Sequence, residues 1–139
     1  MRLVVDTNIL VSALLSGTSL PAQLIVLWRQ GRFELLTAPE QMDELRRVTR
    51  YPRIRERLAP ALAGRLVNDL RALAVTMDRL PVVDVSTDPD DNYLLAITIA
   101  GSADFLLTGD KRDLLGIVTY GGTRIVTVRA FLALHEALP

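Results

Sequence analysis

The chain has 139 residues, a formal net charge of zero and no cysteine, which excludes disulfide frameworks, thiolate metal sites and a global basic field. Its length suits one domain over residues 1–139, and because half of its residues are apolar, a core can form without staples. The N-terminus is a poor signal peptide and no apolar run nears the ~20 residues that span a bilayer, so we expect a soluble, cytoplasmic protein with no membrane partner.

Strand-like and helix-like segments alternate along the chain. In order, we expect a strand at residues 2–5, helices at 8–17 and 20–31, a strand at 33–37, helices at 37–50 and 60–77, a short strand at 80–85, a helix at 88–101, a strand and turn at 103–110, a last strand at 123–128 and a final helix at 129–138. Several strands are almost wholly apolar, which predicts a parallel sheet covered on both faces. The expected fold is a three-layer α/β/α sandwich.

Particular residues mark the ends of the expected helices. Gly17 and Gly31 close the first two helices. Thr37 and Glu40 stand at capping-box spacing, which predicts the start of the helix that follows.

Acidic residues follow the expected strands. Asp6 ends the first strand and Asp110 ends the strand and turn at 103–110, while a cluster of aspartates lies before the helix at 88–101. In open parallel sheets, sites form at the carboxyl ends of strands where the strand order reverses. We therefore predict that these acids share one edge of the sheet.

Each acid also has a purely structural interpretation. Asp6 suits the N-cap position of a helix. Alternatively it is a metal ligand, and Asn8 orients that ligand or a bound water. Helix residues are spaced by about 100°, which puts Glu44 on the flank of the buried stripe, close to Val48. From this position its side chain would lean into a cleft. The alternative for Glu44 is an exposed residue that pairs with Arg47.

The segment from residue 88 to 91 carries three aspartates. Asp88 suits an N-cap, and Asp90 and Asp91 complement the helix dipole. Their mutual repulsion would be relieved by a divalent cation; Asp91 is the first candidate ligand and Asp88 the second. In the later turn, Thr108 and Asp113 accompany Asp110.

Carboxylates without cysteine or clustered histidine match Mg²⁺ or Mn²⁺. Such ions activate water and neutralise a phosphate, so the predicted reaction is metal-dependent phosphodiester hydrolysis. The predicted catalytic and metal-holding residues are Asp6, Glu44, Asp91 and Asp110. The only histidine, His135, is expected to be a surface or packing residue.

Of the sixteen basic residues only Lys111 is a lysine. Arginine suits phosphate contacts, and it can stack on bases. Several arginines crowd into one segment, and the RNA-contact candidates there are Arg46, Arg47, Arg50 and Arg53. The alternative is a solvated helix face and loop.

The quoted stretches "VVDTNILVSALL", "PEQMDELRRV" and "DPDDNYLLAITIAGSADFLLTGDKRDLL", with a closing strand and helix, resemble the PIN domain family over nearly the whole chain. The likeness is to small single-domain toxins of toxin–antitoxin pairs (VapC-like). It implies an α/β/α fold, a Mg²⁺- or Mn²⁺-dependent ribonuclease, a homodimer and an antitoxin that blocks the cleft.

Carried over residue by residue, the four family acids match Asp6, Glu44, Asp91 and Asp110. The polar residues near the first and fourth acids match Asn8 and Thr108. Where toxin relatives have one acid, this chain offers Asp88 beside Asp91 and Asp113 beside Asp110, so either of each pair is a candidate. The alternatives to a toxin are an RNA- or protein-binding module that does not cleave and a housekeeping RNA-processing nuclease.

Overall fold

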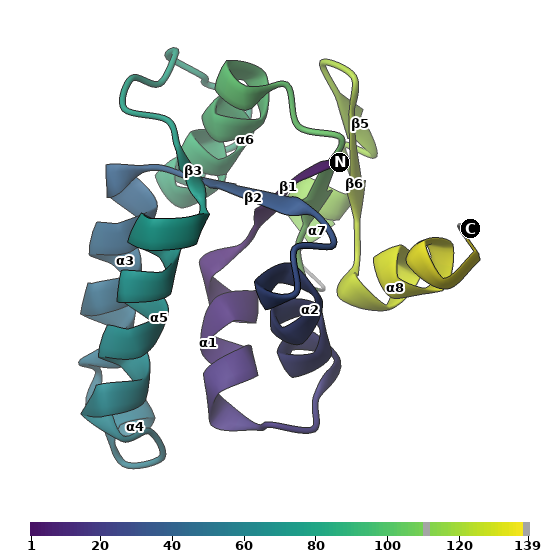
Figure 1. Cartoon of the computed structure of the whole chain (residues 1–139). Helices are drawn as coiled ribbons and strands as arrows, with labels where there is room; N and C mark the ends of the chain where they lie inside the picture. The colour runs from purple at the N-terminus through teal and green to yellow at the C-terminus, as the bar shows by residue number, and fades with distance from the viewer. Residues whose placement is uncertain (110–111, 138–139) are drawn as a thin grey trace.

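A computed structural model describes residues 1–109 and 112–137 of the chain. Within these residues six strands form one sheet (Figure 1). The strands are β1 (Arg2–Val5), β2 (Glu34–Thr37), β3 (Val75–Thr76), β4 (Phe105–Leu107), β5 (Thr119–Tyr120) and β6 (Thr123–Val126). Their order is β3-β2-β1-β4-β6-β5, and every pairing is parallel except that of β5 with β6.

The strand order reverses at β1. From β1 the chain builds β2 and β3 on one side, and it returns later to add β4 on the other side. Val4 pairs with Leu36 of β2 and with Leu106 of β4, so β1 is the centre of the sheet. The carboxyl ends of β1 and β4 therefore meet at the topological switch point, where open α/β sheets place their sites.

Helices cover both faces of the sheet. The helices are α1 (Thr7–Leu15), α2 (Leu20–Arg29), α3 (Pro39–Thr49), α4 (Pro52–Arg55), α5 (Pro60–Leu73), α6 (Pro89–Gly101), α7 (Arg112–Leu115) and α8 (Val128–Ala137). Side chains from α1, α2, α3, α5 and α8 fill the core on one face, and side chains from α6 and α7 fill it on the other. The structure confirms the three-layer α/β/α fold with a mostly parallel sheet.

Alternation along β1 explains how one short strand serves both cores. Leu3 and Val5 enter the cluster under α1 and α2, whereas Val4 enters the cluster under α6. All three are almost fully buried. These three positions are buried on one face or the other, which explains why the strand is apolar after Arg2.

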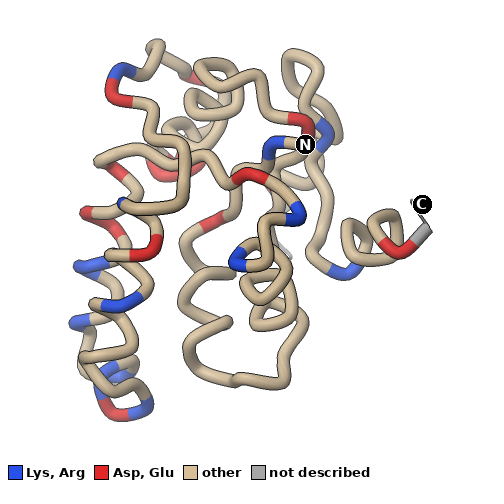
Figure 2. Tube along the Cα trace, in the orientation of Figure 1, with Lys and Arg blue, Asp and Glu red and all other residues tan. Residues whose placement is uncertain are grey.

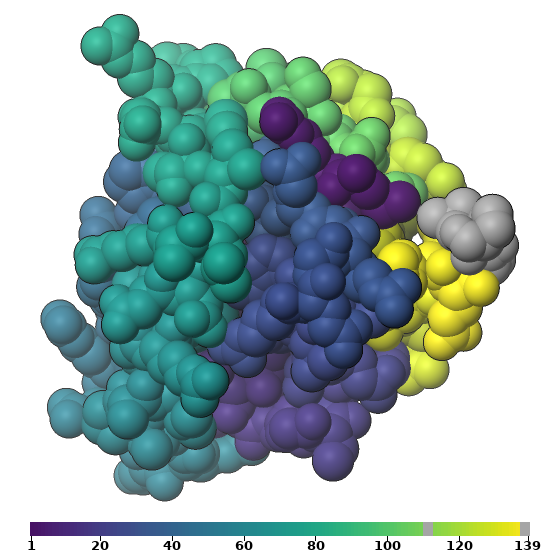
Figure 3. All heavy atoms as spheres, in the orientation of Figure 1, coloured from purple at the N-terminus to yellow at the C-terminus, as the bar shows by residue number. Residues whose placement is uncertain are grey.

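Helices α2 and α5 lie side by side on the face in view in Figure 3. The guanidinium of Arg29 donates two hydrogen bonds, of 3.0 and 2.8 Å, to one carboxylate oxygen of Asp69 and links the two helices. The loop between β3 and α6 stands out from the body at the upper left of the same view.

Two expectations about elements were wrong, and one strand was missed. Residues 80–85 form no strand, because Val82 is almost completely exposed and the apolar run buries little. The expected helix at 60–77 ends at Leu73, and Val75 then pairs with Leu36 as β3. Strand β5 was not anticipated.

A pair of glycines makes β5 possible. Gly121 and Gly122 have φ values of +52° and +84° and connect β5 to β6 as a tight hairpin. Positive φ at both central residues of a two-residue loop is the requirement that glycine meets at little cost.

The capping box expected at the start of α3 was also wrong. Ala38 is the N-cap and makes no side-chain cap hydrogen bond. Thr37 is fully buried, and its hydroxyl donates to the Gln41 side chain at 2.8 Å. Gln41 in turn donates to the carbonyl of Val5, which ties α3 to the end of β1.

Among the described residues no single helix is long and apolar enough to cross a bilayer; only α1 and α2 together, bent by 99°, reach that length and hydropathy.

Candidate active site

Asp6 and Thr108 meet at the switch point of the sheet. Val5 pairs with Leu107, so the residue after each strand lies beside the other. The Thr108 hydroxyl donates to Oδ2 of Asp6 at 2.9 Å, and both residues are almost fully buried. Asp6 and Thr108 therefore share the predicted edge of the sheet, and Thr108 is the threonine that precedes the fourth candidate acid, Asp110.

Asp6 also caps α1. The backbone N–H of Asn8 donates to Oδ1 of Asp6 at 3.1 Å. The structural and the functional interpretations of Asp6 are thus compatible, because its two oxygens have different neighbours. The side chain of Asn8 is exposed and makes no hydrogen bond within the described residues, and its expected orienting role stays a prediction.

Glu44 lies where its flank position on α3 predicted. It is only 9% exposed, and its Oε2 has no hydrogen-bond partner among the described residues. Burial raises the pKa of Glu44, the Thr7 hydroxyl lowers it, and the negative charges of Asp90 and Asp6 raise it further. The alternative, an exposed ion pair with Arg47, does not occur in the described part of the chain.

Thr7 and Tyr93 form a second contact beside these carboxylates. The Thr7 hydroxyl and the Tyr93 phenol lie 2.9 Å apart and join α1 to α6. Burial, with the charges of Glu44, Asp6 and Asp90, raises the pKa of Tyr93, so its hydroxyl stays protonated. Sequence reasoning missed both residues; the only signal was that Thr7 stands between two candidates.

The aspartates at the start of α6 have separate roles. Asp88 caps the helix and accepts from the Asp90 N–H at 2.9 Å. Asp91 is buried and accepts from the Ser86 hydroxyl at 3.1 Å. Asp90, which was assigned to the helix dipole, is exposed yet close enough to Glu44 to raise its pKa.

Asn92 fixes the loop that presents Ser86. Its side-chain oxygen accepts from the N–H groups of Val85 and Ser86 at 3.1 and 2.9 Å, and its amide donates to the Ser86 carbonyl at 2.8 Å. The segment before α6 is therefore held by α6 itself, which positions the hydroxyl on Asp91.

The fourth acid is not placed. Asp110 lies outside the described residues, and Asp113 is exposed on α7, where it makes no hydrogen bond or ion pair within the described part of the chain. Counting only residues 1–109 and 112–137, no group of three or more Asp, Glu or His side chains is arranged to hold a metal ion.

The donor chemistry nevertheless fits a hard cation. Asp6, Glu44 and Asp91 are three buried carboxylates, and Oε2 of Glu44 is a buried oxygen without a donor in the described residues. An unpartnered buried carboxylate oxygen is costly, and Mg²⁺ or Mn²⁺ prefers such oxygens.

The arginine candidates lie further along α3, at its C-cap and on α4. Figure 2 shows Lys and Arg gathered on the lower part of α3 and around α4. Arg46 and Arg50 line a pocket there, whereas Arg47 and Arg53 are exposed and do not line it. His135 stacks on Phe131 with ring centroids 5.9 Å apart, as expected of a packing residue.

Comparison with known proteins places this arrangement in a family. The PIN domain model matches residues 2–112, from β1 to the start of α7. The chain belongs to the PIN domain family. PIN domains are generally nucleases, and they generally use divalent metals.

One curated relative of this PIN domain is the uncharacterized protein MJ1680 of Methanocaldococcus jannaschii. It is 26% identical over 120 residues, which cover 84% of this chain and 75% of the relative. No solved structure matches the chain.

Proposed function

We propose that this PIN domain is a Mg²⁺- or Mn²⁺-dependent endoribonuclease that acts as the toxin of a toxin–antitoxin pair. The observation that carries the nuclease is that Asp6 is buried at the switch point and lies close enough to the buried Glu44 of α3 to raise the pKa of Glu44, while Asp91 is buried at the start of α6. A non-cleaving module has no need for a buried glutamate whose pKa is raised by burial and by the negative charges of neighbouring aspartates.

The residues that would hold the ion are Asp6, Glu44 and Asp91, with Asp110 as the fourth. When bound, the ion supplies an activated water and neutralises charge on the phosphodiester. The chain's own groups fix the ligands: Thr108 donates to Asp6, and Ser86 donates to Asp91. Because these partners hold the carboxylates before RNA arrives, little reorganisation is needed during the reaction.

The deciding experiment is a Mn²⁺ titration with a labelled RNA, comparing the wild type with Asp6→Asn. We expect cleavage that rises with Mn²⁺ in the wild type and is lost in the variant. Asp43→Asn, on the exposed side of α3, is the matched control and should cleave normally. Equal cleavage by wild type and Asp6→Asn would contradict the nuclease. Binding without cleavage would favour the RNA- or protein-binding module.

The toxin assignment adds two partners, an antitoxin that covers the cleft and a second copy of the chain. Light scattering tests the homodimer. Co-expression with the product of a short neighbouring gene tests the antitoxin: co-purification with loss of cleavage supports it. Cleavage without any such neighbour would point to a housekeeping RNA-processing nuclease.

A further inference from the structure

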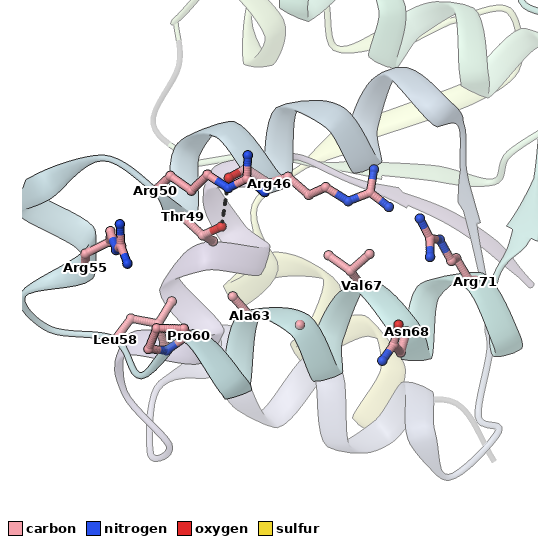
Figure 4. A pocket seen from close by; sticks show the side chains of 11 residues that line it. Arg46, Thr49, Arg50, Arg55, Leu58, Pro60, Ala63, Val67, Asn68 and Arg71 are labelled. Carbon is pink, nitrogen blue, oxygen red and sulfur yellow. Dashed lines mark hydrogen bonds between the residues drawn. The ribbon is translucent and has the colours of Figure 1, made fainter.

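One pocket of the described structure has none of the candidate carboxylates in its lining. It has a volume of about 470 Å³ and lies between α3, α4 and α5 (Figure 4). Its lining residues are Arg46, Thr49, Arg50, Arg55, Leu58, Pro60, Ala63, Gly64, Val67, Asn68 and Arg71. We call it the arginine groove. It contains four guanidinium groups and no carboxylate.

The four arginines divide between the two ends of the groove. Figure 4 shows Arg50 and Arg55 at one end, and Arg46 and Arg71 extending toward each other at the other end. Among the described residues only Arg46 has an acidic partner, Asp43 at 3.3 Å on the exposed side of the helix. Like charges that converge without carboxylates repel one another, and an anion between them relieves the repulsion.

The floor between the two ends is apolar. Leu58 and Val67 are almost fully buried, and Pro60 and Ala63 complete this surface. The Thr49 hydroxyl already donates to the carbonyls of Leu45 and Arg46, so it offers little to a ligand. A peptide strand would need partners for several backbone amides, and besides Thr49 only the Asn68 side chain offers a neutral polar group in the lining. A base can lie on such a floor, and guanidiniums take phosphates bidentately.

Helix geometry connects this groove to the carboxylates. Around α3, Arg47 lies about 60° from Glu44, Arg50 about 120° and Arg46 about 160°, measured in the direction away from Gln41. The Gln41 side chain contacts the carbonyl of Val5 at the end of β1. The arginines thus form a band that leads from the flank of Glu44 around the exposed side of α3 into the groove. Arg50 lies ~9 Å further along the helix axis than Glu44.

We propose that the arginine groove is a subsite for single-stranded RNA, which holds one nucleotide with its base on the apolar floor and its flanking phosphates on the two arginine pairs. The proposal rests on the proposed function for its substrate class. The strand would pass around α3 from this subsite to the carboxylates, so the groove anchors RNA away from the bond that is cut.

The test measures binding in EDTA, where cleavage does not interfere. The probe is a fluorescein-labelled oligouridylate of ten nucleotides, titrated with protein at several salt concentrations. The groove variant is Arg50→Ala/Arg71→Ala. The control is Arg57→Ala/Arg65→Ala, which removes the same charge from the turn after α4 and from α5 at exposed positions outside the groove. All four arginines are at least partly exposed, and circular dichroism verifies that both variants fold.

We expect the groove variant to bind at least tenfold more weakly, with a salt slope smaller by about 1.4 for the two lost phosphate contacts. The control should stay within about twofold. Equal weakening in both variants would overturn the subsite, because it would indicate a diffuse charge effect. Competition by polyglutamate as strong as by unlabelled oligouridylate would also overturn it, in favour of an acidic protein partner.

Failure of the two proposals can be told apart. If the wild type does not cleave with Mn²⁺ but the groove variant alone loses binding in EDTA, the subsite stands and the nuclease falls. If the wild type cleaves and the groove variant binds normally, the nuclease stands and the subsite falls. If both stand, the groove variant should raise KM and leave kcat within about twofold.

Discussion

The Thr108 hydroxyl donates a 2.9 Å hydrogen bond to Oδ2 of Asp6 across the seam between β1 and β4. Both residues are almost fully buried, and they come from segments 102 residues apart in the sequence. This bond therefore links the closure of the sheet to the position of a candidate metal ligand.

Thr108→Val should damage both stability and activity. The variant removes a buried donor to a carboxylate, which costs about 1–3 kcal/mol in the free energy of unfolding. It should also lower Mn²⁺ affinity about 10-fold or more. Urea unfolding and a Mn²⁺ titration of RNA cleavage measure the two effects.

Thr123→Val is the control for Thr108→Val, because the buried Thr123 hydroxyl donates to the Ala103 carbonyl at 2.7 Å in another part of the sheet. It should lose stability and keep its Mn²⁺ dependence. Thr108→Ser should retain both properties. If Thr108→Val lost stability but kept its Mn²⁺ affinity, the role of Thr108 would be structural only.

Asp6→Asn and Asp6→Ala should have opposite effects on the protein in EDTA. Asn keeps an oxygen that accepts from the Asn8 N–H, and its amide nitrogen can donate to the Thr108 oxygen, which reverses the direction of that hydrogen bond. The change also removes a negative charge near Glu44, so the melting temperature should be equal or higher. Ala loses the cap and should cost about 1–2 kcal/mol. A lower melting temperature for Asp6→Asn would show that the negative charge itself stabilises the metal-free fold.

Glu44→Gln should change how stability in EDTA depends on pH. The pKa of Glu44 is raised above 4.5 in the fold, chiefly by burial. Its protonated form therefore stabilises the protein fully below pH 4.5, and that contribution is lost as pH rises through the raised pKa. Because Gln resembles the protonated form, the variant's advantage in melting temperature should be small at pH 4 and grow toward neutral pH.

Glu40→Gln is the reference for that pH series. Glu40 is exposed in the first turn of the same helix, where a negative charge is mildly favourable. Its replacement should give a small loss, not a gain, at neutral pH. Identical pH profiles for the wild type and Glu44→Gln would mean that Glu44 is well solvated.

Tyr93→Phe should weaken the link between α1 and α6. The phenol contributes the 2.9 Å contact to the Thr7 hydroxyl, and losing it costs about 1 kcal/mol, or roughly 3–5 °C in melting temperature. Tyr120→Phe is the control, since its hydroxyl makes no hydrogen bond in the described part of the chain. Equal melting temperatures for wild type and Tyr93→Phe would show that the contact contributes nothing to stability.

The sequence predicted the site best where a side chain follows a strand. Asp6 and Thr108 were placed correctly because parallel strands bring their carboxyl ends to one edge, whatever lies between them. Glu44 was placed by helical periodicity, which needs only local information.

The sequence did not predict contacts that depend on how helices pack. Thr7 and Tyr93 meet through the docking of α1 and α6, and Asp90 approaches Glu44 although its position in α6 predicts exposure. Similarly, Arg71 joins Arg46 only because α5 lies along α3. None of these pairs has a sequence spacing that signals contact.

The central position of β1 has a consequence during synthesis. β1 leaves the ribosome well before β4, so a nascent chain carries Asp6 without the strand and the threonine that complete its surroundings. Pairings between such distant segments form late in folding. The surroundings of Asp6 can therefore assemble only after β4 has been translated, and under the proposed function an unfinished polypeptide would not cleave RNA.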